Sequence, residues 1–246
     1  MNGIEKIGEY FLLMGRVFRM PDRWRMFWRQ MSKEMEKQGL ESILITLIVS
    51  VFMGAIMTLQ TKLNTENPLL PAYSTGLVTR DCILLEFSST ILCLLLAGKV
   101  GSNIASEIGT MRITEQIDAL EIMGVNSASY LILPKVIATV LFFPLLTLFS
   151  IFVGILGGYA IAAVTGIMLP GDYISGLLYM FVPYSILYAL VKGVVFAFLI
   201  TTISAYWGYY AKGNSLEVGR ASTRAVVSSS VAIMIFDLIL TQIMRA

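Results

Sequence analysis

The feature that most constrains this chain is a run of 36 residues, 136–171, without a single charged side chain. A helix crosses a bilayer core with about 20 apolar residues, so such a run is typical of membrane spans. The composition agrees, because 57% of the residues are hydrophobic and only 14% are charged, against about 25% charged in soluble domains. The apolar runs are continuous and do not alternate with polar residues, which favours helices over a barrel. We therefore expect an all-α integral membrane protein.

Five apolar segments are long enough to span. They are residues 43–61, residues 82–98, a segment that begins near residue 135, residues 184–206 and residues 225–244. Residues 173–182 are expected to form a short interfacial helix that is broken at Pro183. The pairs Asn67-Pro68 and Leu70-Pro71 predict a loop between the first two spans.

The N-terminal segment, residues 1–38, holds eight of the eighteen basic residues. These are Lys6, Arg16, Arg19, Arg23, Arg25, Arg29, Lys33 and Lys37. Mixed with tryptophan and phenylalanine, they are typical of a helix in the headgroup layer of an anionic membrane face. A nucleic-acid arm is disfavoured because a membrane span follows at once, and the segment is too polar for a cleavable signal peptide. We expect an interfacial amphipathic helix over 1–38 and a five-span domain over 39–246.

The basic residues also predict the orientation of the chain. With five spans, the loops on one side (1–42, 99–135 and 208–224) hold 14 Lys and Arg, and the other side holds 3. Cytoplasmic loops carry the excess of Lys and Arg. The N-terminus is therefore expected in the cytoplasm and the C-terminus outside, whereas six spans would spoil the asymmetry.

Residues 101–126 form the one long interior segment that is dense in both charges and glycines. Thr114 is expected to cap a short helix, and Gly124 to end it. Ile113, Ile117 and Leu120 would share one stripe of that helix, and Glu115, Asp118 and Glu121 another. Two interpretations remain open at this point: a docking element for a partner, or a connecting helix that packs on its own protein.

Three charged residues, Glu86, Lys192 and Asp237, interrupt apolar runs. A charge at membrane depth is costly and needs a partner, so we expect Lys192 to pair with Glu86, Asp237 or both. The set is either purely structural or a polar spot that receives a lipid headgroup or drives a conformational change.

The residue types that are missing exclude several kinds of catalysis. The chain has no histidine, which removes histidine-based triads and most zinc sites. It also has no GxxxxGK[ST] motif for ATP. We expect no catalytic residue, metal site or cofactor in this chain.

Three segments resemble the MlaE-type permeases. They are VFMGAIMTLQ at 51–60, AGKVGSNIASEIGTMRITEQ at 97–116 and GRASTRAVVSSS at 219–230. The stretches around Lys192 and Asp237 are also typical of that family, whose members are membrane subunits of ABC transporters that work with MCE proteins in phospholipid traffic. The resemblance covers nearly the whole chain.

The resemblance implies a homodimer in the bacterial inner membrane and a periplasmic MCE ring. It also implies a cytoplasmic ATPase dimer that binds ATP and Mg and contacts the loop after the second span. The transporter would move phospholipid or a related lipid and maintain outer-membrane lipid asymmetry. It also implies two sets of site residues. The ATPase-coupling set is Glu107, Arg112, Glu115, Gln116, Asp118 and Glu121. The lipid-binding set is Phe52, Met57, Leu59, Gln60 and Glu86.

One segment departs from the family pattern. Many members read Arg-Glu-Leu-Gly-Pro in the second span, where this chain reads Leu85-Glu86-Phe87-Ser88-Ser89. Without the Gly-Pro pair, that helix is expected to be straighter.

Two other functions are less compatible with the sequence. A stand-alone ion-coupled secondary transporter of a hydrophobic substrate is disfavoured because the five spans show no inverted repeat. An intramembrane lipid enzyme is disfavoured because histidine is absent.

Overall fold

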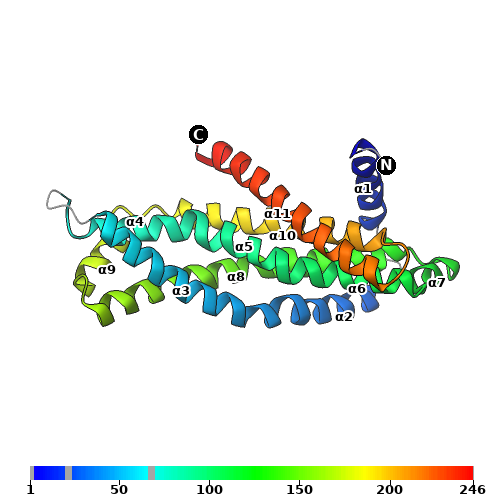
Figure 1. The fold of residues 1–246 in the computed structure, drawn as a ribbon, viewed down its shortest axis with the longest axis horizontal. Coiled ribbons are helices and arrows are strands. Elements are labelled where there is room, and N and C mark those ends of the chain that lie inside the picture. Colours follow the sequence, from blue (N-terminus) through cyan, green and yellow to red (C-terminus); the bar gives the residue numbers. More distant parts are fainter. Residues whose placement is uncertain (1–2, 20–23, 66–69, 246) are drawn as a thin grey trace. The chain divides into compact units, whose positions relative to one another are not determined.

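The computed structural model describes residues 3–19, 24–65 and 70–245, and every regular element among them is helical. In chain order these elements are α1 (Gly3–Val17), α2 (Trp24–Glu34), the π-helical η1 (Met35–Leu40), α3 (Glu41–Asn64), α4 (Ser74–Cys82), the π-helical η2 (Ile83–Ile91), α5 (Leu92–Leu96), the π-helical η3 (Ala97–Gly101), α6 (Ser102–Ile113), α7 (Gln116–Ile122), α8 (Ser127–Thr165), α9 (Pro170–Leu178), α10 (Tyr184–Tyr209) and α11 (Ser215–Arg245) (Figure 1). Arg23 and the Asn67-Pro68 pair lie outside the described residues. The predicted all-α class is confirmed.

Five continuous helical stretches are long and apolar enough to cross a membrane. They are Trp24–Asn64, Ser74–Ile113, Ser127–Thr165, Tyr184–Tyr209 and Ser215–Met244. Each predicted span begins within one of them. Polar residues extend the helices beyond the predicted spans 43–61 and 82–98 at both ends, whereas α8 ends at Thr165, inside the charge-free run 136–171. The boundary expected after residue 38 lies inside the first stretch. The short helix expected over 173–182 is α9, which ends at Leu178.

The chain divides into two compact units. Unit one comprises Met1–Glu41, Leu94–Phe143 and Val194–Ala246. Unit two comprises Ser42–Cys93 and Pro144–Gly193. Each unit therefore combines segments that are far apart in the sequence.

In unit two, small residues let α3 and α8 approach closely. A Cβ atom added at Gly54 would lie 1.8 Å from the Gly154 carbonyl oxygen, and one at Gly157 would lie 2.4 Å from that of Val51. The Ser50 hydroxyl donates to Ser150 Oγ across this contact, at 2.7 Å. Close approach at glycine and serine is the usual way for membrane helices to gain packing energy without a hydrophobic driving force.

The other contact in unit two joins α4 and α9, which run side by side (Figure 1). Arg80 of α4 is buried and donates to the carbonyl oxygens of Leu177 at 3.0 Å and Tyr179 at 2.7 Å. These carbonyls lie at the end of α9, where the helix leaves acceptors without intrahelical partners. Arg80 thus supplies hydrogen-bond donors to the carbonyl groups at the end of α9. The following residue, Met180, has a positive φ of 44° and is 76% exposed.

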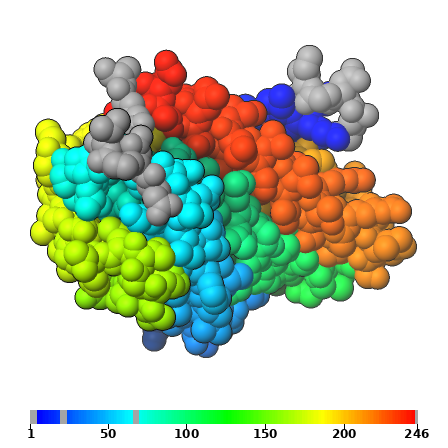
Figure 2. Space-filling view, turned by 60° about the vertical axis from the view of Figure 1, so that its left-hand side comes forward, coloured from blue at the N-terminus to red at the C-terminus, as the bar shows by residue number. Residues whose placement is uncertain are grey.

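In unit one, α11 packs along α6, and the Ser222 hydroxyl donates to the Ser102 carbonyl at 3.2 Å. Helices α8 and α10 share a hydrogen bond between Thr139 and Thr201, at 2.7 Å. The opposite side of α11 is open. Only 11% of its most apolar stretch of 18 residues is buried, and Figure 2 shows much of this helix on the surface. An apolar helix with so little cover needs lipid or another protein chain against it.

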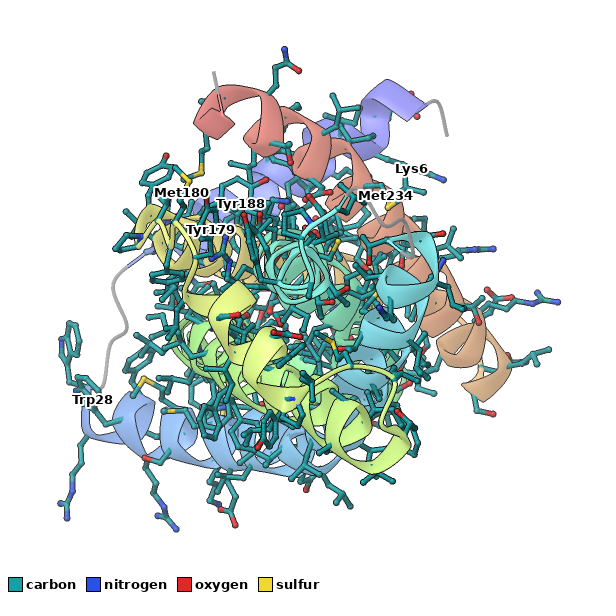
Figure 3. The ribbon with its side chains drawn as sticks, turned by 90° about the vertical axis from the view of Figure 1, so that its left-hand side faces the viewer. Lys6, Trp28, Tyr179, Met180, Tyr188 and Met234 are labelled. Carbon is teal, nitrogen blue, oxygen red and sulfur yellow. The ribbon has the colours of Figure 1, made fainter. Side chains whose placement is uncertain are left out.

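The N-terminal helix α1 is fastened to α10. The Tyr10 hydroxyl donates to Thr202 Oγ1 at 2.8 Å, and the Tyr206 hydroxyl donates to a Glu9 carboxylate oxygen at 3.1 Å. Further along the chain, Trp28 of α2 points away from the ribbon with 55% of its surface exposed (Figure 3). Exposed tryptophan beside arginine suits a membrane interface.

Replacing Gly54 by alanine should destabilise unit two. The added methyl group meets the backbone of Gly154, which no side-chain rotation can relieve, and overpacking of this kind costs about 1–3 kcal/mol. The thermal unfolding midpoint in detergent should therefore fall by several degrees. Gly171→Ala is the matched control, because nothing lies within 4 Å of its added Cβ. Equal midpoints for the two variants would contradict the close α3–α8 contact.

Candidate functional site

The most distinctive surface element is α7, which follows the second spanning-length helix. The segment predicted over 101–126 divides at Thr114: α6 continues the preceding helix, and α7 is the short helix that was expected next. The predicted capping role of Thr114 is wrong, because its hydroxyl donates backwards to the Thr110 carbonyl at 2.8 Å. A threonine near the end of a helix can bond its own preceding turn instead of capping the next helix.

Both ends of α7 are sharply defined. Glu115 precedes it with a positive φ of 58°, which turns the chain between α6 and α7. Gly124, with φ of 77°, ends it as predicted. The Gly124 amide donates to the Glu121 carbonyl and the Val125 amide to the Leu120 carbonyl, at 3.0 and 3.1 Å. This pair of bonds is a Schellman motif.

Side chains anchor α7 to the rest of unit one. The Ser127 and Tyr209 hydroxyls both donate to Glu121 Oε1, at 2.8 and 2.9 Å. The Arg112 guanidinium donates to Asp118 Oδ1 at 2.6 Å, and it also lies 5.8 Å from the centre of the Tyr209 ring. Three of the residues expected to contact an ATPase, Arg112, Asp118 and Glu121, are therefore engaged within the chain.

The remaining face of α7 is open. Glu115 and Gln116 are exposed, as their predicted coupling role requires, and so are Ile122 at 86% and Met123 at 68%. The predicted apolar stripe faces inward at Ile117, which is fully buried. Sequence reasoning missed Ile122 and Met123. The signal was available, since Ile122 lies opposite the predicted stripe when residues are placed 100° apart around a helix.

Glu107, a fourth member of the coupling set, is also engaged inside unit one. Its Oε2 atom accepts from Lys37 and from Lys135, each at 2.9 Å. All six coupling residues belong to unit one, and Glu115, Gln116 and Glu121 are the exposed ones among them. Contact with an ATPase remains a prediction for the whole set.

In unit two, Lys192 meets Glu86 as hypothesised. Lys192 Nζ lies 3.1 Å from Glu86 Oε1 and 3.2 Å from the Leu85 carbonyl oxygen, with the Tyr188 ring centre 4.5 Å away. The lysine side chain is fully buried, whereas that of Glu86 is 44% exposed and also accepts from Thr90 Oγ1 at 3.1 Å. Tyr188 and Thr90 were not anticipated.

The backbone around Glu86 is π-helical over η2. Turns of this kind occur often at functional sites. The helix continues without a break through the position of the missing Gly-Pro pair. Asp237, the third charge, belongs to α11 of unit one, where it is partly buried. Its membership of the network remains a prediction.

The predicted lipid-binding residues on α3 do not all share a face. Phe52, Leu59 and Gln60 fall on one side of the helix, with Phe52 63% exposed, whereas Met57 falls on another. A small cavity of about 10 Å³ in unit two lies beside Ser50, Gly54 and Ser150. That volume suits about one water molecule and cannot hold a lipid. Across residues 3–19, 24–65 and 70–245, no group of three or more His, Cys, Asp or Glu side chains could hold a metal ion.

The Glu86–Lys192 pair should show energetic coupling. Lys192→Met strands a partly buried carboxylate and should lower the thermal midpoint, and adding Glu86→Gln should restore part of it. Contacting charges typically couple by about 0.5–3 kcal/mol, and the exposure of Glu86 favours the lower end of that range. Unfolding of the two single variants and the double variant measures this coupling. Strictly additive effects would show that the pair contributes nothing.

The anchoring of α7 should depend on pH. Hydrogen bonds from Ser127 and Tyr209 hold the pKa of Glu121 below its ordinary value of 4.5. A carboxyl whose pKa is lower in the folded state stabilises the fold above its unfolded pKa, and this stabilisation is lost as the pH falls through the folded pKa. The wild-type chain should therefore unfold at a higher temperature than Glu121→Gln near pH 6, and the gap should close below pH 4.5. A gap that stays constant over that range would contradict this role.

Comparison with known proteins assigns this chain to a family. The profile described as Permease MlaE matches residues 31–243. A probable ABC transporter permease protein of Rickettsia bellii is 35% identical over 210 residues, covering 83% of this chain and 79% of its own. A protein of the same description from Synechocystis sp. is 34% identical over 241 residues, covering 98% and 91%.

The intermembrane phospholipid transport system permease protein MlaE of Haemophilus influenzae is 32% identical over 207 residues, which cover 84% of this chain and 79% of its own. A family match over most of the chain, relatives above 30% identity and five spanning-length helices agree with one another. This chain is a multi-pass membrane protein and belongs to the MlaE permease family.

Proposed function

We propose that this chain is the membrane subunit of an ABC transporter that moves phospholipid, or a related lipid, between the inner membrane and an extracytoplasmic MCE partner. In this role it would help to maintain outer-membrane lipid asymmetry. The observation that carries the proposal is α7, a helix fixed to unit one by Glu121 and Asp118 while Ile122 and Met123 project outward. The name of the Haemophilus relative supplies the lipid class.

The proposed ATPase contact is the outer face of α7. An exposed apolar pair beside an acidic residue suits a groove with an apolar floor and basic edges. Ile122 and Met123 would fill the groove, and Glu115 and Gln116 would contact its rim. ATP and Mg would be bound by the ATPase, so this chain would act by changing conformation as that partner opens and closes.

The proposed orientation follows from the distribution of basic residues. The 14 Lys and Arg on the α7 side, against 3 on the other, support an orientation with α7 and the N-terminus in the cytoplasm and the C-terminus in the periplasm. The location would be the bacterial inner membrane. The basic and aromatic α1 and α2 would lie in its cytoplasmic interface.

Two apolar surfaces are available for lipid and for a second copy of the chain. On α3, exposed residues recur at helical spacing at Ile48, Phe52, Ile56 and Leu63. On α11, exposed residues include Val227, Val231, Met234 and Leu238. A homodimer would enclose a lipid-sized space between such surfaces. The cavity within unit two, by contrast, has room for about one water molecule. Glu86 and Lys192 would then provide charges for a headgroup or for the conformational change.

The decisive experiment compares wild type with Ile122→Asp in complexes assembled with the ABC ATPase. Native mass spectrometry of the wild-type complex should show two permease chains, two ATPase chains and bound phospholipid. Ile122→Asp should release the ATPase, because a buried unpaired carboxylate opposes docking, while the dimer and its thermal midpoint stay unchanged. Leu178→Asp is the matched control, at a position that is 72% exposed and belongs to unit two, whereas α7 belongs to unit one.

Two outcomes would contradict the proposal. If Ile122→Asp retained the ATPase as well as the wild type, the α7 face would not be the contact. If the purified chain moved lipid in liposomes with an ion gradient and no ATPase, it would be a secondary transporter.

A further inference from the structure

The most buried lysine outside the Glu86–Lys192 pair is Lys135, in the third turn of α8. Its side chain is 1% exposed. Nζ lies 2.5 Å from Glu34 Oε1 and 2.9 Å from Glu107 Oε2. An ammonium group buried to this degree needs such partners, because a buried charge without them is strongly destabilising.

The two carboxylates differ in their surroundings. Glu34 is 8% exposed and also accepts from Gln38 Nε2 at 3.3 Å. Glu107 is 29% exposed and is shared, because Lys37 Nζ also lies 2.9 Å from the same Oε2 atom, with its own side chain 40% exposed. Two acids and two bases thus form a charge-balanced cluster, buried at Lys135 and open at Lys37. We call Glu34, Lys37, Glu107 and Lys135 the Lys135 cluster.

The cluster joins three different helical stretches. Glu34 and Lys37 belong to α2 and η1, within the continuous stretch Trp24–Asn64. Glu107 belongs to α6 near the end of Ser74–Ile113, and Lys135 lies near the beginning of Ser127–Thr165. In sequence, α7 lies between the last two stretches. Figure 1 shows α2, α6 and α7 gathered at one end of unit one.

From this geometry we propose that Lys135 is a positioning residue that holds α6 and α8, the helices before and after α7, against α2 and η1, so that force applied to α7 reaches the first three membrane helices. The proposal rests on the function proposed above, in which a partner ATPase moves α7. It adds a route for that movement within this chain.

Stability alone is a poor explanation for the cluster. Replacing a buried ion pair with apolar residues of similar volume is often neutral or stabilising, and the best-attested use of such pairs is to fix register. Here the register is that of α6 and α8 against η1. The π-helical turn at Lys37 is a further sign that the cluster has a functional role, because such turns occur often at functional sites.

The sharing of Glu107 gives the cluster two arrangements. When α6 moves away from η1, the outer Lys37–Glu107 bond breaks first, at the exposed edge where water can replace it. Lys135 keeps Glu34 throughout, so no buried charge is left without a partner. Elements that transmit movement between sites need two discrete arrangements of this kind.

The test uses a charge-balanced variant, Glu34→Gln with Lys135→Met, which leaves the Lys37–Glu107 pair in place. Hydrogen exchange is measured by mass spectrometry on the purified permease, without an ATPase. The amides of α7 should exchange at least about five-fold faster, while those of α10 and α11 keep the wild-type rate. Lys33→Met is the control, because it makes the same chemical change at an exposed position of α2.

The second readout uses the complex with the ATPase in liposomes. The number of ATP molecules hydrolysed per lipid transferred should rise at least about five-fold, the lower end of usual coupling between sites. A merely structural role would lower both rates together. If the double variant fails to fold, Lys37→Met should give a smaller change of the same sign, since it removes only the exposed edge of the cluster.

Three results would overturn the proposal: unchanged exchange in α7 of a folded double variant, equally faster exchange in all helices of unit one, or an unchanged ratio of ATP to lipid. Failure of the wild-type complex to bind any ATPase would instead reject the proposed function. The exchange experiment on the permease alone distinguishes the two cases.

Discussion

The membrane-spanning helices must satisfy their backbone hydrogen bonds where water is absent. A helix does so within itself, which is why the five spanning stretches continue for 26 to 41 residues. The hydroxyl groups inside the units follow the same rule. Thr46, Thr58 and Ser229 donate to carbonyls one turn earlier in their own helices. Few polar groups therefore remain for contacts between helices, which pack against one another through small residues and a few buried charges.

The buried charges lie where helices must be held in register. Arg80 closes the end of α9, Lys192 joins α10 to the π-helical part of the second stretch, and Lys135 joins α8 to α2 and α6. Each cation has carbonyl or carboxylate oxygens within about 3 Å, as a low-dielectric interior requires. An ion pair in such surroundings fixes the register of the helices that it joins, because separating its charges would leave one of them buried without a partner. Charges therefore help to set the geometry within each unit, beside the close glycine contacts of α3 and α8.

At α7, the structure confirms that the helix packs on its own protein, while its role as a docking element for a partner stays a proposal. One side of the helix packs on its own protein through Ile117, Asp118 and Glu121, and the other side stays open at Ile122 and Met123. The internal bonds hold the open face at a fixed position. A docking element that transmits force needs both properties, because a loosely attached helix would absorb the movement of its partner.

The sequence by itself determined the helical class, the five spans, the stop at Gly124 and the need of Lys192 for an acidic partner. These follow from local rules: apolar length, glycine at positive φ, and the cost of a charge inside an apolar run. The tertiary structure alone decided that Glu107 turns inward to Lys135, that Thr114 bonds α6, and that Glu34, 101 residues from Lys135, is its closest partner. Such pairings depend on which helices come together, and helical periodicity places a side chain on a face without specifying its neighbour.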